Sequence, residues 1–259
     1  IVGEEWSLNP VVVSFWQRGK VNSNGYVSSL PSVMDFPIQD TFNRSLLAPE
    51  NWNSGWINVY EMLGNDHLYP DPSSLVIFPD NHDMDRFFTQ INYDFDLFKM
   101  GMVYFSTLRG IPQFYYGTEI LMKNEKEGHG QIRSDFPGGW KGDMINGFTG
   151  KGLTTQEQEA KALTTKLLNW RKEKAVIHTG KLMQFAPEDG VYSFFRYNEK
   201  EKVMIIFNKN DKETVVSMDK YNEMIGDKSN AFDVLNDRRF PLESTLRIPP
   251  KTALILEIN

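Results

Sequence analysis

Two acidic side chains and a histidine stand directly after short apolar runs. The run at 1–3 leads into Glu4, and the run at 75–78 leads into Asn81, His82 and Asp83. Loops that follow parallel strands are a common place for catalytic groups. If these two strand ends converge, Glu4 and Asp83 face one cavity. Two carboxyl groups in one cavity suit cleavage of a glycosidic bond, which needs one protonated acid and one negative charge near the anomeric carbon.

Each of these residues also has a plainer interpretation. Asp83 could cap the next helix, because aspartate is a preferred N-cap residue, and His82 could be an ordinary satisfied polar residue. Glu4 could be a solvent-exposed carboxylate that finishes a strand. The residues alone leave these alternatives open.

Aromatic residues accompany the acidic ones. Trp6 follows Glu4, and a third strand-like run at 112–116 contains Tyr115 and Tyr116. Trp140 stands in a Gly-rich segment, where a core residue is not expected. Flat apolar faces beside carboxylates favour a neutral sugar as the ligand.

Composition restricts the class of protein. With 259 residues, of which 40% are hydrophobic, the chain can bury a substantial core. No apolar stretch approaches the roughly 18 residues that a membrane span requires. A net charge of −6 and scattered Lys and Arg residues disfavour a nucleic-acid partner. The absence of cysteine excludes disulfides and thiolate metal sites.

The elements that position these residues change in kind along the chain. Up to about residue 174, apolar runs near 1–4, 33–38, 75–79 and 112–116 alternate with helical patterns, which predicts βα units and a parallel sheet. Helices are expected from about Phe95 to Arg109 and from Thr154 to Lys174, with a weaker one at 57–63.

The pattern after residue 175 is all-β. Runs at 191–197 and 202–208 flank a four-residue hairpin loop. Further strand-length runs lie at 213–218, 231–235, 244–248 and 252–258. We therefore expect two domains, an α/β unit at 1–175 and an antiparallel β-sandwich at 176–259. The Gly-rich segment at 123–153 lacks periodicity, and we expect it to border the cleft.

Four motifs resemble the α-amylase family of glycoside hydrolases in order and spacing. They are Gly3-Glu4-Glu5-Trp6, Met34-Asp35-Phe36-Pro37, the run from Phe78 to Arg86 and the run from Gly110 to Glu119. The stretch from Ile132 to Trp140 is similar to the neopullulanase and cyclomaltodextrinase branch. The resemblance implies strands five to eight of a (β/α)₈ TIM barrel, followed by an antiparallel β-sandwich.

By this resemblance Glu4 is the general acid/base and Asp83 the carboxylate that steadies the transition state. Successive strand residues point to opposite sides, so Glu4 and Glu5 cannot both face the centre, and the motif favours Glu4. His82 resembles a donor to sugar hydroxyls. Asn81 and Arg86 resemble groups that orient the loop, although Arg86 could instead form a surface ion pair. Trp6, Tyr116 and Trp140 complete the expected substrate-binding set.

The family's nucleophilic Asp, with its Arg and a second His, lies on strands that would precede Ile1. A retaining mechanism needs that nucleophile, so we expect the chain alone to be inactive. A half-barrel exposes two sheet edges, which predicts self-association. We expect no cofactor in this part of the chain, and the question of a structural calcium in the preceding part stays open.

The full-length parent is therefore expected to cleave α-glucosidic bonds in maltooligosaccharides, cyclodextrins, pullulan or starch. A transglycosidase of the same family would use the same groups, and a non-catalytic carbohydrate-binding relative is the third alternative. The expected partner is an α-glucan, with no nucleic acid and no membrane span. The resemblance favours a periplasmic or extracellular location, which the N-terminus of this chain does not reveal.

Overall fold

The computed structural model describes residues 1–125 and 128–258. Its first part contains four short parallel strands, β1 (Val2–Gly3), β2 (Ser32–Val33), β3 (Val76–Ile77) and β4 (Ile111–Pro112). Hydrogen bonds pair β1 with β2 and β3 with β4, and a bridge between Met34 and Val76 joins the two pairs. The strands therefore lie side by side in chain order, as βα units require.

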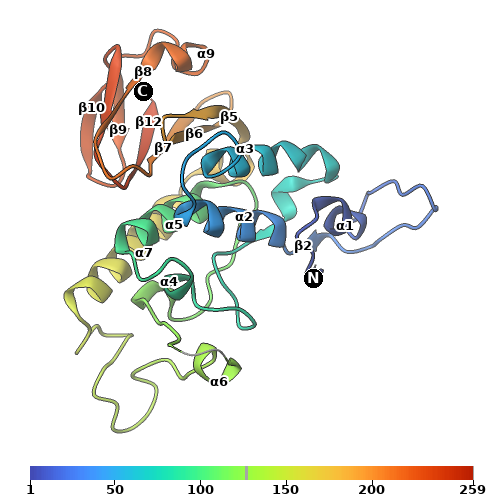
Figure 1. Cartoon of the computed structure of the whole chain (residues 1–259), viewed down its shortest axis with the longest axis vertical. Helices are drawn as coiled ribbons and strands as arrows, with labels where there is room; N and C mark the ends of the chain where they lie inside the picture. The colour runs from blue at the N-terminus through green and yellow to red at the C-terminus, as the bar shows by residue number, and fades with distance from the viewer. Residues whose placement is uncertain (126–127, 259) are drawn as a thin grey trace.

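Most helices of the described ranges belong to this first part, whereas α9 lies in the antiparallel part that follows (Figure 1). The helices are α1 (Pro10–Phe15), α2 (Phe36–Leu47), α3 (Trp56–Gly64), α4 (Phe87–Gln90), α5 (Phe95–Thr107), α6 (His129–Ile132), α7 (Thr155–Lys172), α8 (Ala175–Thr179) and α9 (Asn222–Ile225). Four short 3₁₀ turns accompany them: η1 (Asn65–Leu68), η2 (Pro72–Ser74), η3 (Thr118–Ile120) and η4 (Met218–Tyr221). None of the helices within 1–125 and 128–258 has the length and apolarity that a membrane span requires.

Two of the predicted helices are confirmed, and their ends follow the expected local chemistry. Helix α5 begins after Asp94, whose carboxylate accepts hydrogen bonds from two backbone N–H groups of the first turn. Helix α7 begins with a capping box in which Thr154 and Glu157 bond each other's backbone N–H groups. The weaker helix predicted at 57–63 corresponds to α3.

The expected strand at 33–38 is wrong in its second half. The chain leaves β2 at Val33, and α2 begins at Phe36. Asp35 accepts a hydrogen bond from the Ile38 N–H at 3.3 Å, and Pro37 occupies the first turn. An aspartate N-cap followed by proline starts a helix, and this signal outweighs the apolar run.

The predicted change to antiparallel strands is confirmed. Six strands form one sheet in the order β10-β9-β12-β7-β6-β5, and β8 pairs with β11. Their bounds are β5 (Lys181–Glu188), β6 (Val191–Tyr197), β7 (Lys202–Asn208), β8 (Thr214–Ser217), β9 (Asn230–Asp233), β10 (Arg238–Pro241), β11 (Thr245–Ile248) and β12 (Thr252–Ile258). The sequence prediction missed β5 and β10. Both are edge strands, where polar residues, bulges and proline are tolerated and the alternating pattern is weak.

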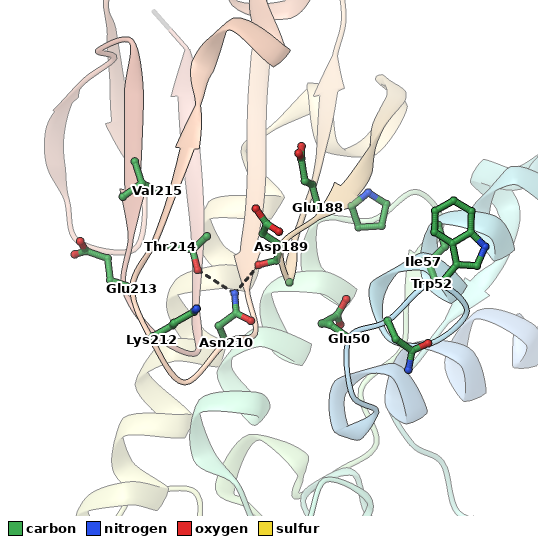
Figure 2. A pocket seen from close by; sticks show the side chains of 13 residues that line it. Glu50, Trp52, Ile57, Glu188, Asp189, Asn210, Lys212, Glu213, Thr214 and Val215 are labelled. Atoms are coloured by element: carbon green, nitrogen blue, oxygen red, sulfur yellow. Dashed lines mark hydrogen bonds between the residues drawn. The ribbon is translucent and has the colours of Figure 1, made fainter.

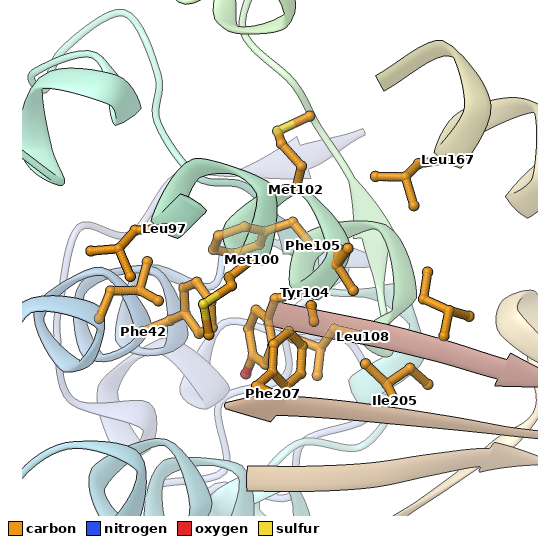
Figure 3. Packing of buried hydrophobic residues seen from close by; sticks show 14 of the residues in the cluster. Phe42, Leu97, Met100, Met102, Tyr104, Phe105, Leu108, Leu167, Ile205 and Phe207 are labelled. Carbon is orange, nitrogen blue, oxygen red and sulfur yellow. The ribbon is translucent and has the colours of Figure 1, made fainter. Parts of the chain in front are cut away.

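The six-stranded sheet buries both faces. One face, with Phe207 and Ile205, packs on α5, where Tyr104 stacks on Phe42 of α2 with ring centroids 3.9 Å apart (Figure 3). The other face packs on β8, β11 and α9 around Met204 and Ile206. The antiparallel part thus has a core of its own and also completes the core of the first part.

Buried arginines tie α5 to its neighbours. Arg171 of α7 donates to the carbonyl oxygens of Ser106 and Gly110, and Arg196 of β6 donates to those of Thr107 and Gly180, at 2.8–3.0 Å. The bonds to Ser106 and Thr107 satisfy carbonyls at the end of α5 that lack helical partners. Burial lowers the pKa of Arg171 to about 10 and that of Arg196 to about 9.

Candidate active site

Three strand ends are joined by aromatic contacts. Trp6, which follows β1, stacks on Phe36, which follows β2, with ring centroids 4.8 Å apart. Phe36 meets Phe78, which follows β3, edge to face at 5.1 Å. The residues that follow β1 and β3 are therefore packed through the residue that follows β2. This contact chain fixes the strand ends that carry Glu4 and Asp83 relative to each other.

Glu4 lies at the first of these ends. Its side chain is exposed, and within the described part of the chain it forms no hydrogen bond or ion pair. Glu5 is half-buried. Trp6 is 50% exposed, since Phe36 covers only part of its ring. The first strand end thus presents an unengaged carboxylate beside an aromatic ring.

Asp83 is surrounded by nitrogen donors. His82 Nε2 lies 3.1 Å from Asp83 Oδ2, and Arg133 Nη2 binds Asp83 Oδ1. His129 Nδ1 lies 3.8 Å from the same Oδ1. The backbone N–H of Asp83 donates to Asn81 Oδ1 at 2.8 Å. Both carboxylate oxygens and the backbone of Asp83 are therefore held in place, while its side chain remains 26% exposed.

Asp83 does not cap a helix, so the capping alternative is wrong. The next helix, α4, has Arg86 at its N-cap position and no side-chain cap. Asp80 instead accepts a hydrogen bond from the Phe87 N–H at 2.8 Å and another from the Thr118 hydroxyl at 3.0 Å. Asp80 is fully buried, and desolvation raises its pKa to about 6.

Asn81 and Arg86 lie beneath the loop. They are 1% and 0% exposed, so neither reaches solvent. The alternative that Arg86 forms a surface ion pair is wrong, because this side chain is buried and donates to the Tyr116 carbonyl oxygen. Its guanidinium carbon lies 4.2 Å from the ring centroid of Tyr115 and 4.8 Å from that of Tyr116. In this arrangement Arg86 joins the loop after β3 to the loop after β4.

Tyr116 keeps part of its ring accessible. It is 39% exposed, and its hydroxyl donates to the Ser134 carbonyl oxygen at 2.9 Å. The ring of Tyr115 is 6.4 Å from that of His82. Desolvation raises the pKa of Tyr115 to about 12. Aromatic faces therefore lie next to the histidine of the Asp83 cluster.

The segment at 123–153 bends back to this site through Arg133. Figure 1 shows residues 128–153 as a long arm that contains the single-turn helix α6. Arg133 follows α6, binds Asp83 and donates from Nε to the His82 carbonyl oxygen at 2.9 Å. The sequence analysis did not select Arg133. It lies inside the quoted stretch 132–140, but no local pattern identifies a partner 50 residues away.

Trp140 lies farther along the same segment. It is 67% exposed, and its ring stacks on no other aromatic ring of the described residues. Phe148 is 66% exposed and contacts Phe136 at 4.7 Å. The structure brings Asp83, His82, Asn81 and Tyr116 together around Arg86 and Arg133. Within 1–125 and 128–258, no hydrogen bond, ion pair or ring contact joins Trp140 to that group.

A buried ion network supports the middle strand end. Arg109 Nη1 donates to Asp35 Oδ2 at 2.7 Å, and its other nitrogens bind Asp66. Burial raises the pKa of Asp35 against the opposing effect of Arg109. Since Asp35 also caps α2, this network holds Phe36 under Trp6.

Comparisons with known proteins match both parts of the chain. Residues 1–175 match the alpha amylase catalytic domain, and residues 182–257 match the cyclo-malto-dextrinase C-terminal domain. The chain is 25% identical to a cyclomaltodextrin glucanotransferase of Klebsiella oxytoca, over 87% of this chain and 36% of that protein. It is 26% identical to alpha-amylase 3 of Dictyoglomus thermophilum, over 100% of this chain and 51% of that protein. The chain thus spans a third to a half of these relatives.

A solved structure shows the same fold. The α-amylase of Geobacillus thermoleovorans, complexed with acarbose, aligns with a TM-score of 0.75 at 21% identity. The alignment covers 100% of this chain and 53% of that one. The resemblance found in the sequence motifs is confirmed by these matches. Because the catalytic-domain pattern covers more than half of its residues, the chain belongs to the α-amylase family.

Proposed function

We propose that this chain is part of a retaining glycoside hydrolase that cleaves α-glucosidic bonds in maltooligosaccharides, cyclodextrins, pullulan or starch. The observation that carries the proposal is the aromatic contact chain from Trp6 through Phe36 to Phe78. It joins the strand ends that bear the two carboxyl groups such a reaction needs. In this proposal residues 1–175 belong to the catalytic barrel, and residues 176–259 form the C-terminal domain.

Glu4 is the proposed general acid/base. Its exposed, unengaged carboxyl group is free to meet the leaving oxygen and, later, an attacking water. Its neighbour Glu5 is half-buried and has no proposed catalytic role. Trp6 offers its open face to a sugar ring beside this acid.

Asp83 is the proposed carboxylate that steadies positive charge at the anomeric carbon. His82 and Arg133 orient its two oxygens, so the negative charge needs little rearrangement in the transition state. His82 is half-exposed and can also donate to a sugar hydroxyl. Asn81 and Arg86 are buried and act on the substrate only indirectly, by holding this loop.

Tyr116 and Trp140 are the proposed further stacking faces, since both keep exposed ring surface. The segment at 123–153 contacts the loop of Asp83 through Arg133 and contacts Tyr116 through the Ser134 carbonyl. These contacts support its proposed place at the border of the cleft. The covalent nucleophile would come from the part of the parent that precedes Ile1.

Transfer to a sugar acceptor is the second candidate function, because several relatives are named cyclomaltodextrin glucanotransferases. Both reactions use the same carboxyl groups and differ in the acceptor.

We expect the full-length parent to convert maltoheptaose into α-configured products, with Glu4→Gln strongly impaired. Proton NMR of the first products identifies the anomer, and added labelled maltose detects transfer.

The outcomes separate the candidates. Reducing ends formed without incorporation of label support hydrolysis, whereas labelled longer chains support transfer. β-configured products would exclude a retaining mechanism on α-glucans. A parent that binds maltoheptaose without any turnover would support the non-catalytic relative instead.

A further inference from the structure

A groove of about 730 Å³ lies away from the residues described above. Its walls are the loop that joins α2 to α3 and two turns of the antiparallel domain, β5 to β6 and β7 to β8 (Figure 2). Its volume falls within the range of about 300–1,000 Å³ that is typical of ligand pockets. The groove therefore has room for a small molecule or for a segment of a polymer.

Helix α2 separates this groove from the candidate active site. The helix begins beside the strand ends, at Phe36, and ends at Leu47, just before the loop that lines the groove. Twelve helical residues span roughly 18 Å. A ligand in the groove would thus lie at the far end of α2 from Glu4 and Asp83, and it would take no part in the reaction.

Trp52 stands on the loop side of the groove. It is 96% exposed, at the tip of a tight turn closed by the bridge between Asn51 and Ser54. The backbone N–H of Asn53 donates to Asn51 Oδ1 at 3.1 Å and stiffens this turn. The turn thus presents a large, flat apolar ring to solvent, and such a ring can stack on the apolar face of a sugar.

The opposite wall presents polar groups in fixed positions. Asn210 Nδ2 donates to the Asp189 carbonyl oxygen at 2.6 Å and to Thr214 Oγ1 at 2.9 Å (Figure 2). Gly190 has a φ of +73°, and a Cβ there would lie 2.3 Å from Asn210 Oδ1. Glycine at this position thus allows Asn210 to lie against the turn.

The charged side chains of the groove that have no ion-pair partner among the described residues carry no net charge. Three of its carboxylates, those of Glu50, Glu188 and Glu213, are each within 2.5–3.4 Å of a lysine or arginine nitrogen. The side chains of Asp189 and Lys212 form no hydrogen bond or ion pair with any described residue. One free carboxylate and one free ammonium group disfavour a strongly charged ligand and suit a neutral one that is rich in hydroxyl groups.

We propose that this groove is a second, non-catalytic binding site for an α-glucan chain. Trp52 stacks on the apolar face of one glucose unit, and Asp189 and Lys212 hydrogen-bond hydroxyls of the chain from the opposite wall. The choice of an α-glucan over other neutral carbohydrates rests on the proposed function. The site would hold the polymer close to the enzyme while the active site works on another part of it.

The test uses the 259-residue chain labelled with fluorinated tryptophan, whose six Trp signals are followed by fluorine NMR during titration with maltoheptaose. The spectrum of Trp52→Phe assigns the Trp52 signal. We expect maltoheptaose to shift this signal. We expect Trp52→Ala to weaken the binding of maltoheptaose at this site by at least about tenfold, as truncation of a central aromatic anchor does. A fluorescent maltoheptaose measures this affinity, because the variant lacks the Trp52 signal.

Two variants serve as matched controls. Trp140→Ala removes another exposed indole and should leave the Trp52 shift unchanged, because Trp140 lies on the segment near the candidate active site. Asp189→Asn should weaken binding by a few fold without moving the backbone. Asp189 has a φ of +50°, which asparagine adopts as readily as aspartate.

An unmoved Trp52 signal overturns the proposal. If the Trp6 and Trp140 signals then move, the proposed function still stands; if they also stay unmoved, both proposals lose support. An equal response to cellohexaose would overturn the assignment to an α-glucan. A Trp52 shift that depends on protein concentration and needs no sugar would show that a second copy of the chain fills the groove, and would also overturn the proposal.

Discussion

The substitution Asp83→Asn should lower turnover strongly while changing the free energy of unfolding only slightly. Asp83 and its partners are partly exposed, with side-chain exposures of 26% for Asp83, 52% for His82 and 45% for Arg133. Exposed ion pairs contribute about 0–1 kcal/mol each, and asparagine keeps one oxygen and nearly the same shape. The backbone hydrogen bond to Asn81 does not involve the substituted group. With two such partners, the free energy of unfolding should therefore fall by no more than about 2 kcal/mol.

Turnover should respond far more strongly than stability. The charge of Asp83 is needed chiefly when the anomeric carbon becomes positive, so its loss should raise the barrier without changing the fold. Removal of one preorganised electrostatic group typically lowers kcat on the order of 10²–10³-fold. We expect a loss of this size in the full-length parent acting on maltoheptaose.

Asp85→Asn is the matched control for this change. Asp85 lies two residues farther along the same loop, is also half-buried, and accepts a hydrogen bond from Asn124 Nδ2 at 2.6 Å. The substitution Asp85→Asn removes the same charge from the loop. We expect it to change kcat by less than about threefold, since Asp85 has no proposed contact with the sugar.

Steady-state kinetics of the parent and urea unfolding of both variants provide the measurements. The reasoning fails if Asp83→Asn lowers the free energy of unfolding by about 3 kcal/mol or more, as a core defect would. It also fails if Asp85→Asn lowers kcat as much as Asp83→Asn does, because the effect would then come from the net charge of the loop.

Three other expectations can be checked directly. Glu4→Gln should lower turnover of the parent by about 10²–10⁴-fold and Glu5→Gln far less, measured by steady-state kinetics; a larger loss at Glu5 would show that the strand register is wrong. Burial raises the pKa of Asp80 to about 6, above its ordinary 3.8, so the folded chain holds this proton more tightly than the unfolded chain. The free energy of unfolding should therefore fall by up to about 3 kcal/mol as the pH rises from about 4 to about 6, and urea unfolding of Asp80→Asn should lack this fall. The 259-residue chain alone should self-associate through the exposed edges at β1 and β4 and hydrolyse no glucan; sedimentation and a reducing-sugar assay test this, and activity from purified chain would contradict it.

Local signals predicted much of the fold. The caps of α5 and α7 and the hairpin of β6 and β7 depend on residues only a few positions apart, and all three are confirmed. The same logic failed for α2, where an N-cap and a proline ended a strand earlier than its apolar run indicated. It also failed for the edge strands β5 and β10, because one-sided pairing imposes little pattern on a sequence.

The sequence likewise predicted only part of the candidate site. Their positions after strand-like runs made Glu4, His82 and Asp83 candidates, and the order of the family motifs then selected them. It could not show that Asp80, and not Asp83, receives the N–H of Phe87. Two aspartates three residues apart in a loop have the same local signal, and only their burial distinguishes them.

The sequence by itself determined the family, the change from βα units to antiparallel strands, and the acidic residues that follow the first and third strands. Tertiary structure decided which of these residues meet. The contact of Arg133 with Asp83 spans 50 positions, and the groove between Trp52 and Asp189 joins parts of the chain that are still farther apart. Such contacts depend on how whole elements pack, and side-chain periodicity within one element carries no information about the partner that its loop will reach.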